Sequence, residues 1–189
     1  NSMPKYVNHH QRRQHIIQAA IRLIVAGDIR SISIRTVACE AAMKQSTLRH
    51  YFATYDEMLK AVFLYARNRQ RLRVEQTMKY DSVQNLVAGL METLPIDDQR
   101  REEAVIWLAL CASKRTETIS NIIKEMNNDL NHLCEYIIQR ASGGEIDIVA
   151  ARALRGIIDG LAICMMNDPT DITPEIVEAV LWRYVSTLR

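Results

Sequence analysis

Apolar residues recur along most of this chain at the spacing of one face of a helix, and polar residues fill the positions between them. The first such pattern runs from about residue 10 to 26 and stops at Gly27, a residue type that often follows the end of a helix. Ser33 is a suitable N-cap for a second helix, and a short third helix is expected from about 45 to 51. Two short helices that cross over a tight turn are typical of the helix-turn-helix.

Six further patterns predict a helical body. They lie at about 54–79, 83–94, 100–114, 118–140, 146–167 and from 174 onward. Thr54 with Glu57 indicates a capping box, and the apolar segment 104–112 is expected to be buried on several sides. The arginines between positions 67 and 73 are expected to form a solvated face. The sequence therefore predicts an all-α fold of about nine helices, with a three-helix head followed by a helical bundle.

Composition and charge agree with this picture. Of the 189 residues, 48% are hydrophobic and 24% charged, which is ordinary for a globular protein. The net charge of +2 is unevenly spread: residues 1–60 hold nine Lys and Arg against four Asp and Glu, and residues 61–189 hold fifteen against eighteen. A basic front of +5 on a body of −3 suits contact with an anionic polymer at one end, although chance clustering on a solvated surface gives the same count.

Motifs for catalysis and metal binding are missing from the sequence. The four cysteines, Cys39, Cys111, Cys134 and Cys164, are widely spaced and are expected to be buried thiols. Neither a zinc spacing, a glycine-rich phosphate loop nor a nucleophile elbow occurs. No signal peptide and no apolar stretch of membrane-spanning length is present. We therefore expect a cytoplasmic protein that needs no cofactor or metal and is not an enzyme.

The stretch from Arg13 to about Phe63 carries a family resemblance. Its matching pieces are Ala19-Ala20, Gly27, Val37-Ala38, Thr47-Leu48, and His50-Tyr51-Phe52 leading into Asp56-Glu57-Met58-Leu59. They resemble the DNA-binding domain of TetR-type transcriptional regulators, and residues 48–52 are most similar to the branch of betaine-pathway repressors. The resemblance implies a helix-turn-helix DNA-binding domain over residues 1–54 and a ligand-binding and dimerisation domain over 55–189. It also implies a homodimeric repressor that an unidentified small-molecule effector releases from a palindromic operator.

A helix that reads DNA needs side chains for base edges and donors for the phosphates around it. The candidates for base edges share the outer face of the third helix: Gln45, Ser46, Thr47, Arg49 and His50. The candidates for phosphates flank it: Ser33, Arg35, Lys44, Tyr51 and Tyr55. Lys5, Arg12 and Arg13, at the start of the first helix, are either further phosphate contacts or a solvated basic end.

Three positions depart from the family pattern. Ala42, Lys44 and Tyr55 stand where the family usually has Gly, Ser and often Lys. If the turn needs a positive φ at Ala42, that conformation costs about 1 kcal/mol. Lys44 cannot cap the third helix, and Tyr55 cannot neutralise a phosphate. These departures motivate an alternative function, a helical small-molecule-binding or interaction module whose head no longer binds DNA.

The body carries the expected dimer interface and effector site. Operators of this kind usually have two half-sites about 34 Å, or a multiple of that, apart, so we expect a homodimer. Its interface is predicted on the last two helices, at Ala153, Gly156, Gly160, Val177, Leu181 and Tyr184, although the glycines could instead admit a neighbouring helix of the same chain. The effector candidates, for which plain core packing is the alternative, are Trp107, Cys111, Met126, Leu130, Tyr136, Leu161 and Met165. Trp107 is the strongest, because an aromatic wall suits a cationic or apolar ligand.

Overall fold

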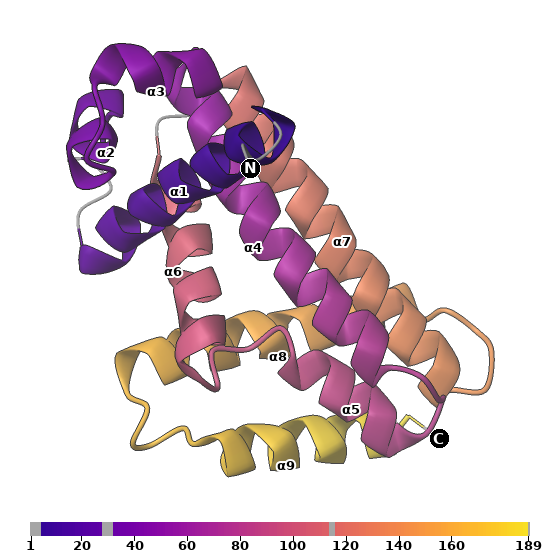
Figure 1. Cartoon of the computed structure of the whole chain (residues 1–189). Helices are drawn as coiled ribbons and strands as arrows, with labels where there is room; N and C mark the ends of the chain where they lie inside the picture. Colours follow the sequence, from indigo (N-terminus) through magenta and orange to yellow (C-terminus); the bar gives the residue numbers. More distant parts are fainter. Residues whose placement is uncertain (1–4, 28–31, 114–115, 189) are drawn as a thin grey trace. The chain divides into compact units, whose positions relative to one another are not determined.

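The computed structural model describes residues 5–27, 32–113 and 116–188, with side chains from Asn8 onward (Figure 1). Within these residues the chain forms nine α-helices: α1 (Lys5–Ala26), α2 (Ile34–Glu40), α3 (Gln45–Tyr51), α4 (Tyr55–Thr77), α5 (Val83–Met91), α6 (Asp98–Ala112), α7 (Glu117–Ala141), α8 (Ile148–Asn167) and α9 (Pro174–Ser186). The predicted all-α fold is confirmed. The main difference is that α1 begins five residues earlier than expected. None of the helices described is both long and apolar enough to cross a bilayer.

The chain divides into two compact units. Unit 1 contains residues 1–66 and 105–122, and unit 2 contains residues 67–104 and 123–189. Helices α4, α6 and α7 each contribute residues to both units. This division differs from the one expected at residue 54, because the first half of α4 belongs to the same compact unit as α1, α2 and α3. The assignment of separate functions to residues 1–54 and 55–189 stays a prediction.

Unit 1 is built on the apolar stripes that the sequence pattern predicts. The stripe of α1 is buried as expected, and so are the inward positions of the next three helices. The caps are also in place at α4, where the Thr54 hydroxyl accepts the Glu57 N–H (3.1 Å) and the Glu57 carboxylate accepts the Ala53 N–H (2.9 Å). The buried side chains that close this core are Ile16, Ile21, Ile24, Val37, Leu48, Phe52, Met58, Leu59, Val62 and Phe63.

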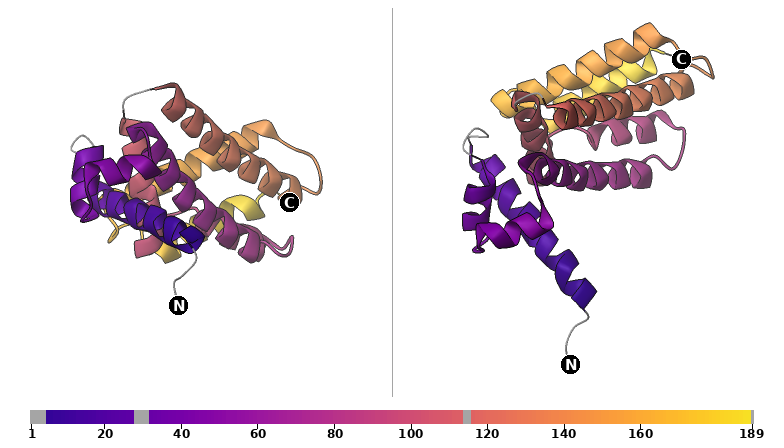
Figure 2. Two further views of the ribbon diagram at one scale, coloured as in Figure 1. Left: turned by 45° about the horizontal axis from the view of Figure 1, so that its top comes forward. Right: turned by 90° about the horizontal axis from the view of Figure 1, so that it is seen from above.

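Unit 2 has its own core, to which α5, α7, α8 and α9 contribute (Figures 1 and 2). Helix α5 packs against α9, and side chains of Ser82, Asp147 and Thr173 cap the first turns of α5, α8 and α9. The centre of the core consists of fully buried aliphatic residues: Leu86, Leu90, Ile137, Ile138, Leu154, Ile158, Leu181 and Val185.

The arginines of α4 do not form the expected solvated face. Within unit 2 only Arg71 among them is exposed, while Arg67, Arg69 and Arg73 are partly buried and paired with carboxylates of other helices. The nearly buried Glu103 accepts from Arg73 (2.6 Å) and Arg69 (3.2 Å), and its hydrogen bond with Arg73 raises the pKa of that guanidinium. The other pairs join Arg67 to Asp129 (2.6 Å), Arg69 to Glu102 (2.8 Å) and Arg73 to Glu92 (3.0 Å).

Two burial expectations are wrong. The apolar run of α6 is not covered on several sides within unit 1, because Ile106 and Leu110 are buried whereas 45% of Leu108 is exposed. Among the cysteines only Cys134 is buried, and loss of solvent raises the pKa of its thiol to about 12. Cys39 and Cys164 are exposed. The periodic pattern identified helices correctly here but overestimated how much of each helix is covered.

The turn between α2 and α3 places Ala42 in the left-handed region, with a φ of 50°. The Ala42 N–H donates to the Cys39 carbonyl (3.0 Å), and the Met43 N–H donates to the Ala38 carbonyl (2.9 Å). This pair of bonds is the Schellman arrangement that closes many helices, and its left-handed residue is usually glycine. The turn is therefore fully hydrogen-bonded, but the Cβ of Ala42 makes it strained.

We predict that Ala42→Gly stabilises the protein. Glycine adopts a positive φ without the clash of a Cβ, and the gain should exceed its extra entropy in the unfolded chain, leaving about 0.5–1 kcal/mol in the free energy of unfolding. Urea denaturation measures this change. The control is Ala61→Gly inside α4, where φ is not positive and the same substitution should destabilise by about 1 kcal/mol. Loss of stability in both variants would show that Ala42 is not strained.

Candidate nucleic-acid interface

Helix α2 begins at a complete capping box. The Ser33 hydroxyl oxygen accepts the Thr36 N–H (3.1 Å), and the Thr36 hydroxyl oxygen accepts the Ser33 N–H (2.8 Å). Ile34, Val37 and Ala38 are buried on the inner side of the helix, and Arg35 is exposed. The capping box thus fixes where α2 starts, and two predicted phosphate contacts, Ser33 and Arg35, lie at this start on either side of Ile34.

Helix α3 has an apolar underside and a polar outer face. Leu48 is fully buried, and Phe52, the residue after the helix, is 1% exposed. The predicted base-reading side chains lie away from these anchors: Gln45, Ser46, Arg49 and His50 are exposed, and Thr47 is half-buried. The expected separation of the two faces is confirmed for the four exposed residues. Their contact with DNA stays a prediction.

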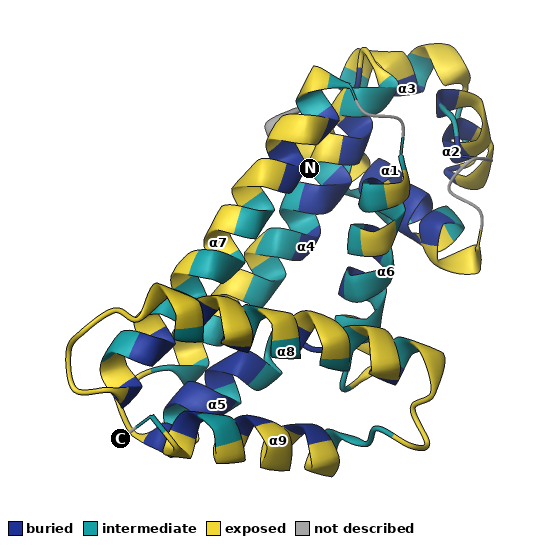
Figure 3. Cartoon of the chain, turned by 180° about the vertical axis from the view of Figure 1, so that it is seen from behind, coloured by how far each residue is buried: buried dark blue, intermediate teal, exposed yellow. Residues whose placement is uncertain are grey.

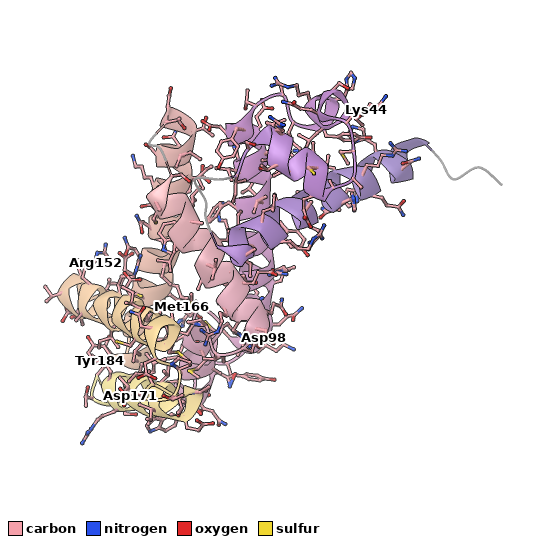
Figure 4. All side chains as sticks on the ribbon, turned by 90° about the vertical axis from the view of Figure 1, so that its left-hand side faces the viewer. Lys44, Asp98, Arg152, Met166, Asp171 and Tyr184 are labelled. Carbon is pink, nitrogen blue, oxygen red and sulfur yellow. The ribbon has the colours of Figure 1, made fainter. Side chains whose placement is uncertain are left out.

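The residues that flank α3 differ in how exposed their side chains are. Lys44 is exposed in the turn before α3 and makes no side-chain cap, as the sequence predicted (Figure 4). Tyr51 is half-buried, with its ring 4.8 Å from the ring of His9. Tyr55 is also half-buried, and burial, together with the charge of Asp56, raises the pKa of its phenol. Tyr55 is therefore a neutral hydrogen-bond donor at the start of α4.

Three polar side chains of α1 hold the next two helices, through partners that the sequence does not predict. Arg13 Nη1 donates to the Tyr51 carbonyl (2.7 Å) and its guanidinium lies over the Phe52 ring (4.1 Å). His15 Nε2 lies 2.9 Å from the Ala41 carbonyl at the end of α2. In addition, an ion pair of 2.7 Å joins Arg22 to Glu40. Arg13 is thus not the solvated basic end that was one of its two expected roles.

The outer face of α3 and the residues beside it are suited to binding by hydrogen bonds and charge. They offer hydrogen-bond donors and acceptors of the types that pair with base edges, together with the exposed cations Arg35 and Lys44. In the part of the chain that the structure describes, no group of three or more His, Cys, Asp or Glu is placed to hold a metal ion. The surface is suited to binding a polyanion.

The effector candidates belong to both units. In unit 1, Trp107 and Cys111 are half-buried on α6, and the Trp107 ring lies 6.5 Å from the ring of Phe63. In unit 2, Met165 is buried, and Met126, Leu130 and Leu161 are half-buried. Leu130, Leu161 and Met165 form part of the core of unit 2, as the alternative of plain packing implies.

Tyr136 does not lie in the interior. It is 37% exposed, its hydroxyl donates to Asp81 (3.1 Å), and the guanidinium of Arg140 lies 5.1 Å from its ring centre. Arg140 also pairs with Asp81 (3.3 Å). The three residues form a polar cluster at the surface of unit 2, so Tyr136 is removed from the set of pocket candidates.

The predicted dimer residues of α9 are already used inside the subunit. Val177 and Leu181 are fully buried in the core of unit 2, which removes them from the expected interface. Tyr184 is half-buried, and its hydroxyl donates to the Ala150 carbonyl of α8 (2.9 Å; Figure 4). The stripe that the sequence pattern identified on α9 therefore faces its own chain.

The predicted dimer residues of α8 lie on the other side of their helix. Ala153, Gly156 and Gly160 are exposed, along the exposed face of α8 (Figure 3). A Cβ built on Gly156 or Gly160 meets no atom within 4 Å. The alternative that these glycines admit a neighbouring helix of the same chain is therefore wrong for the described residues.

Comparison with known families identifies the chain. Residues 16–62 match the tetR family of bacterial regulatory proteins, and residues 82–189 match the C-terminal domain of BetI-type transcriptional repressors. The second match alone covers more than half of the chain. The chain belongs to the TetR family. It is a DNA-binding transcriptional regulator, not an enzyme, and the family resemblance predicted from residues 13–63 is confirmed.

Relatives within the TetR family are distant but match over most of their length. The regulator PksA of Bacillus subtilis is 27% identical over 194 residues, which cover 98% of this chain and 94% of PksA. BetI of Proteus mirabilis is 27% identical over 169 residues, covering 84% and 82%. A transcriptional regulator from Rhodococcus sp. RHA1 has the same fold, with a TM-score of 0.79 at 20% identity over 93% and 95% of the chains. The multidrug-binding protein EbrR, solved with ethidium, has a TM-score of 0.66 at 27% identity over 92% and 98%.

We predict that Lys44→Ser raises the stability of the fold and weakens the electrostatic part of DNA binding. A serine hydroxyl can cap α3, which should raise the free energy of unfolding by about 0.5–1 kcal/mol in urea denaturation. Loss of the cation should lower the slope of log affinity against log salt on duplex DNA by about 1. Lys44→Ala is the matched control, because it removes the same charge without supplying a cap. Equal stability of the two variants would mean that α3 gains nothing from an N-cap.

Proposed function

We propose that this TetR-family regulator is a homodimeric repressor that a small-molecule effector releases from a palindromic operator. The observation that carries the proposal is the exposed row of Gln45, Ser46, Arg49 and His50 on a helix whose underside is fully buried. Arginine pairs bidentately with guanine, and glutamine with adenine, in the major groove. Arg35, Lys44 and Tyr55 bind phosphates and set the register of the head on the duplex. The match to BetI-type repressors supports repression.

The hydrogen-bonded turn argues against the alternative of a head that no longer binds DNA. Ala42 and Lys44 motivated that alternative. Ala42 nevertheless adopts the left-handed conformation with both closing hydrogen bonds formed. Lys44, in place of a capping serine, adds a cation beside the base-reading face. The two departures therefore cost stability and leave the recognition surface in place.

Exposed apolar residues on α8 support the homodimer. Val149 is 79% exposed and Ile163 is 54% exposed. With the two exposed glycines and Ala153 they form one stripe at intervals of three and four residues, on the side of α8 opposite the core. Helix α9 adds three exposed apolar side chains, Ile176, Val180 and Trp182. Exposed apolar side chains arranged in a stripe are typical of an interface, and backbone exposed at glycines allows close helix packing.

An effector in the helical body is supported by the relatives and by Trp107. EbrR is described as a multidrug-binding protein and was solved with ethidium, a flat organic cation. Trp107 is half-buried on α6 beside Phe63, and aromatic faces attract such cations. The effector binds the conformation that fits the operator poorly and so shifts the population away from DNA. We propose Trp107 as the first residue to test for this role.

Selection of bound duplexes from a random pool tests the repressor proposal. An inverted repeat should be enriched, and Arg49→Ala should weaken binding to it by about 1–3 kcal/mol while relaxing preference at one base pair of each half-site. Competition with duplexes that vary at each position measures both effects. Binding of ethidium to the free protein, measured without DNA and lost in Trp107→Ala, would extend the proposal to organic cations as effectors.

The control for this experiment is Arg71→Ala, which removes an exposed cation of α4 outside α3. It should leave the selected sequence unchanged. A pool without any enriched repeat would overturn the repressor function. Retention of both affinity and preference in Arg49→Ala would overturn the assignment of α3 as the reading helix.

We predict that Gly160→Arg converts the dimer to a monomer without unfolding the subunit. The added side chain meets no atom of its own chain within 4 Å of its Cβ, and arginine is a better helix former than glycine. In a dimer the same side chain would hold the partner helix away. Sedimentation velocity at micromolar concentration measures the mass. The control is Asn128→Arg, at an exposed position of α7, which should stay dimeric. A monomeric wild-type protein would remove the dimer from the proposal.

A further inference from the structure

We infer that Arg13 is a positioning residue for DNA reading, which acts by closing the carboxyl end of α3 and not by contacting a phosphate. The inference rests on the proposed role of α3. Arg13 belongs to α1, outside the helix-turn-helix, and is half-buried. Its Nη1 donates to the Tyr51 carbonyl over 2.7 Å, and its Cζ lies 4.1 Å from the centre of the Phe52 ring. The first contact is to Tyr51, the last residue of the reading helix, and the second is to Phe52, which follows it.

The end of α3 needs such a contact. The last four carbonyls of any helix have no partner within it. In α3 the Leu48 carbonyl accepts the Phe52 N–H (3.0 Å), and the Tyr51 carbonyl accepts from Arg13. A guanidinium at this end also complements the negative pole of the helix dipole. The planar group over Phe52 ties the same cation to the apolar anchor beneath the helix.

His9 extends the same contact by one turn of α1. Its ring lies 4.8 Å from the ring of Tyr51, at a tilt of 41°. His9 and Arg13 are four residues apart and therefore lie on one face of α1. One face of the first helix thus holds both the backbone and the ring of Tyr51, and it sets the direction in which Arg49 and His50 leave α3.

A second side chain of α1 closes the preceding helix in a parallel way. The ring of His15 lies 2.9 Å from the carbonyl of Ala41, the residue that ends α2. Helix α1 therefore supplies a side chain to the carboxyl end of α2 and another to the carboxyl end of α3. Of the two, Arg13 is the one whose target belongs to the base-reading helix, so its removal should affect sequence preference most directly.

Arg13→Gln distinguishes a positioning residue from a phosphate contact. The probes are the duplex that the wild-type protein enriches and a scrambled duplex of equal length, each titrated at several salt concentrations. We expect affinity for the enriched duplex to fall by about tenfold, with affinity for the scrambled duplex and the salt slope nearly unchanged. Arg13→Lys should recover only part of the loss, because a lysine keeps the charge but not the planar stack.

The matched control is Arg12→Gln, which removes the same charge from the adjacent residue. Arg12 is exposed and donates to Asn8 within α1. This variant should affect the two duplexes equally. If Arg13→Gln also weakens both duplexes equally and lowers the salt slope by about 1, or if Arg13→Lys behaves as wild type, Arg13 is a phosphate contact and the inference is wrong.

Hydrogen exchange on the free protein tests Arg13 without any operator. In Arg13→Gln the Phe52 amide and the amides of α3 should exchange about tenfold faster, while those of the buried part of α1 stay unchanged. Unchanged exchange in α3 would overturn the inference. If selection enriches no duplex, the proposed function fails, and this measurement still decides whether Arg13 holds α3.

Discussion

A helix of two turns cannot fix its own direction, and the proposed reading of DNA depends on the direction of α3. Isolated helices of seven residues are unstable in water, and the residue before α3, Lys44, makes no side-chain cap. Its orientation therefore comes from contacts at its underside and its end. Leu48 and Phe52 supply the buried anchors, and Arg13 closes the Tyr51 carbonyl. The polar outer face is presented to solvent because the apolar side is held so completely.

Unit 2 is held by a different balance of forces. Four helices enclose an aliphatic core, while the arginines of α4 pair with carboxylates on α6 and α7 and with Glu92, the residue after α5. Glu103 is nearly buried and accepts from two guanidiniums, which offset the cost of removing its charge from water. The positive charge of these arginines is therefore neutralised within unit 2, and the basic character of the chain resides in its first sixty residues.

The helices could be predicted from the sequence because their signals are local. Thr54 with Glu57 and Thr173 with Pro174 mark helix starts within four residues, and the structure has both caps. The outer face of α3 followed from Leu48 and Phe52 in the same way. Partners far apart in the sequence were not predictable. Arg73 of α4 pairs with Glu103 of α6. Arg13 and His15 contact backbone carbonyls, which carry no residue-specific signal in the sequence. An apolar stripe such as Val177 with Leu181 predicts burial but does not show against which surface the residues pack.

The apolar stripe on the outer side of α8 has a consequence for how the protein behaves at different cellular amounts. Side chains such as Val149 and Ile163 gain nothing from the subunit's own core, so any stability that they provide depends on meeting a second copy. In the proposed homodimer the free energy of unfolding therefore rises with protein concentration. A drop in expression would then lower both the number of molecules and the fraction of them that is folded.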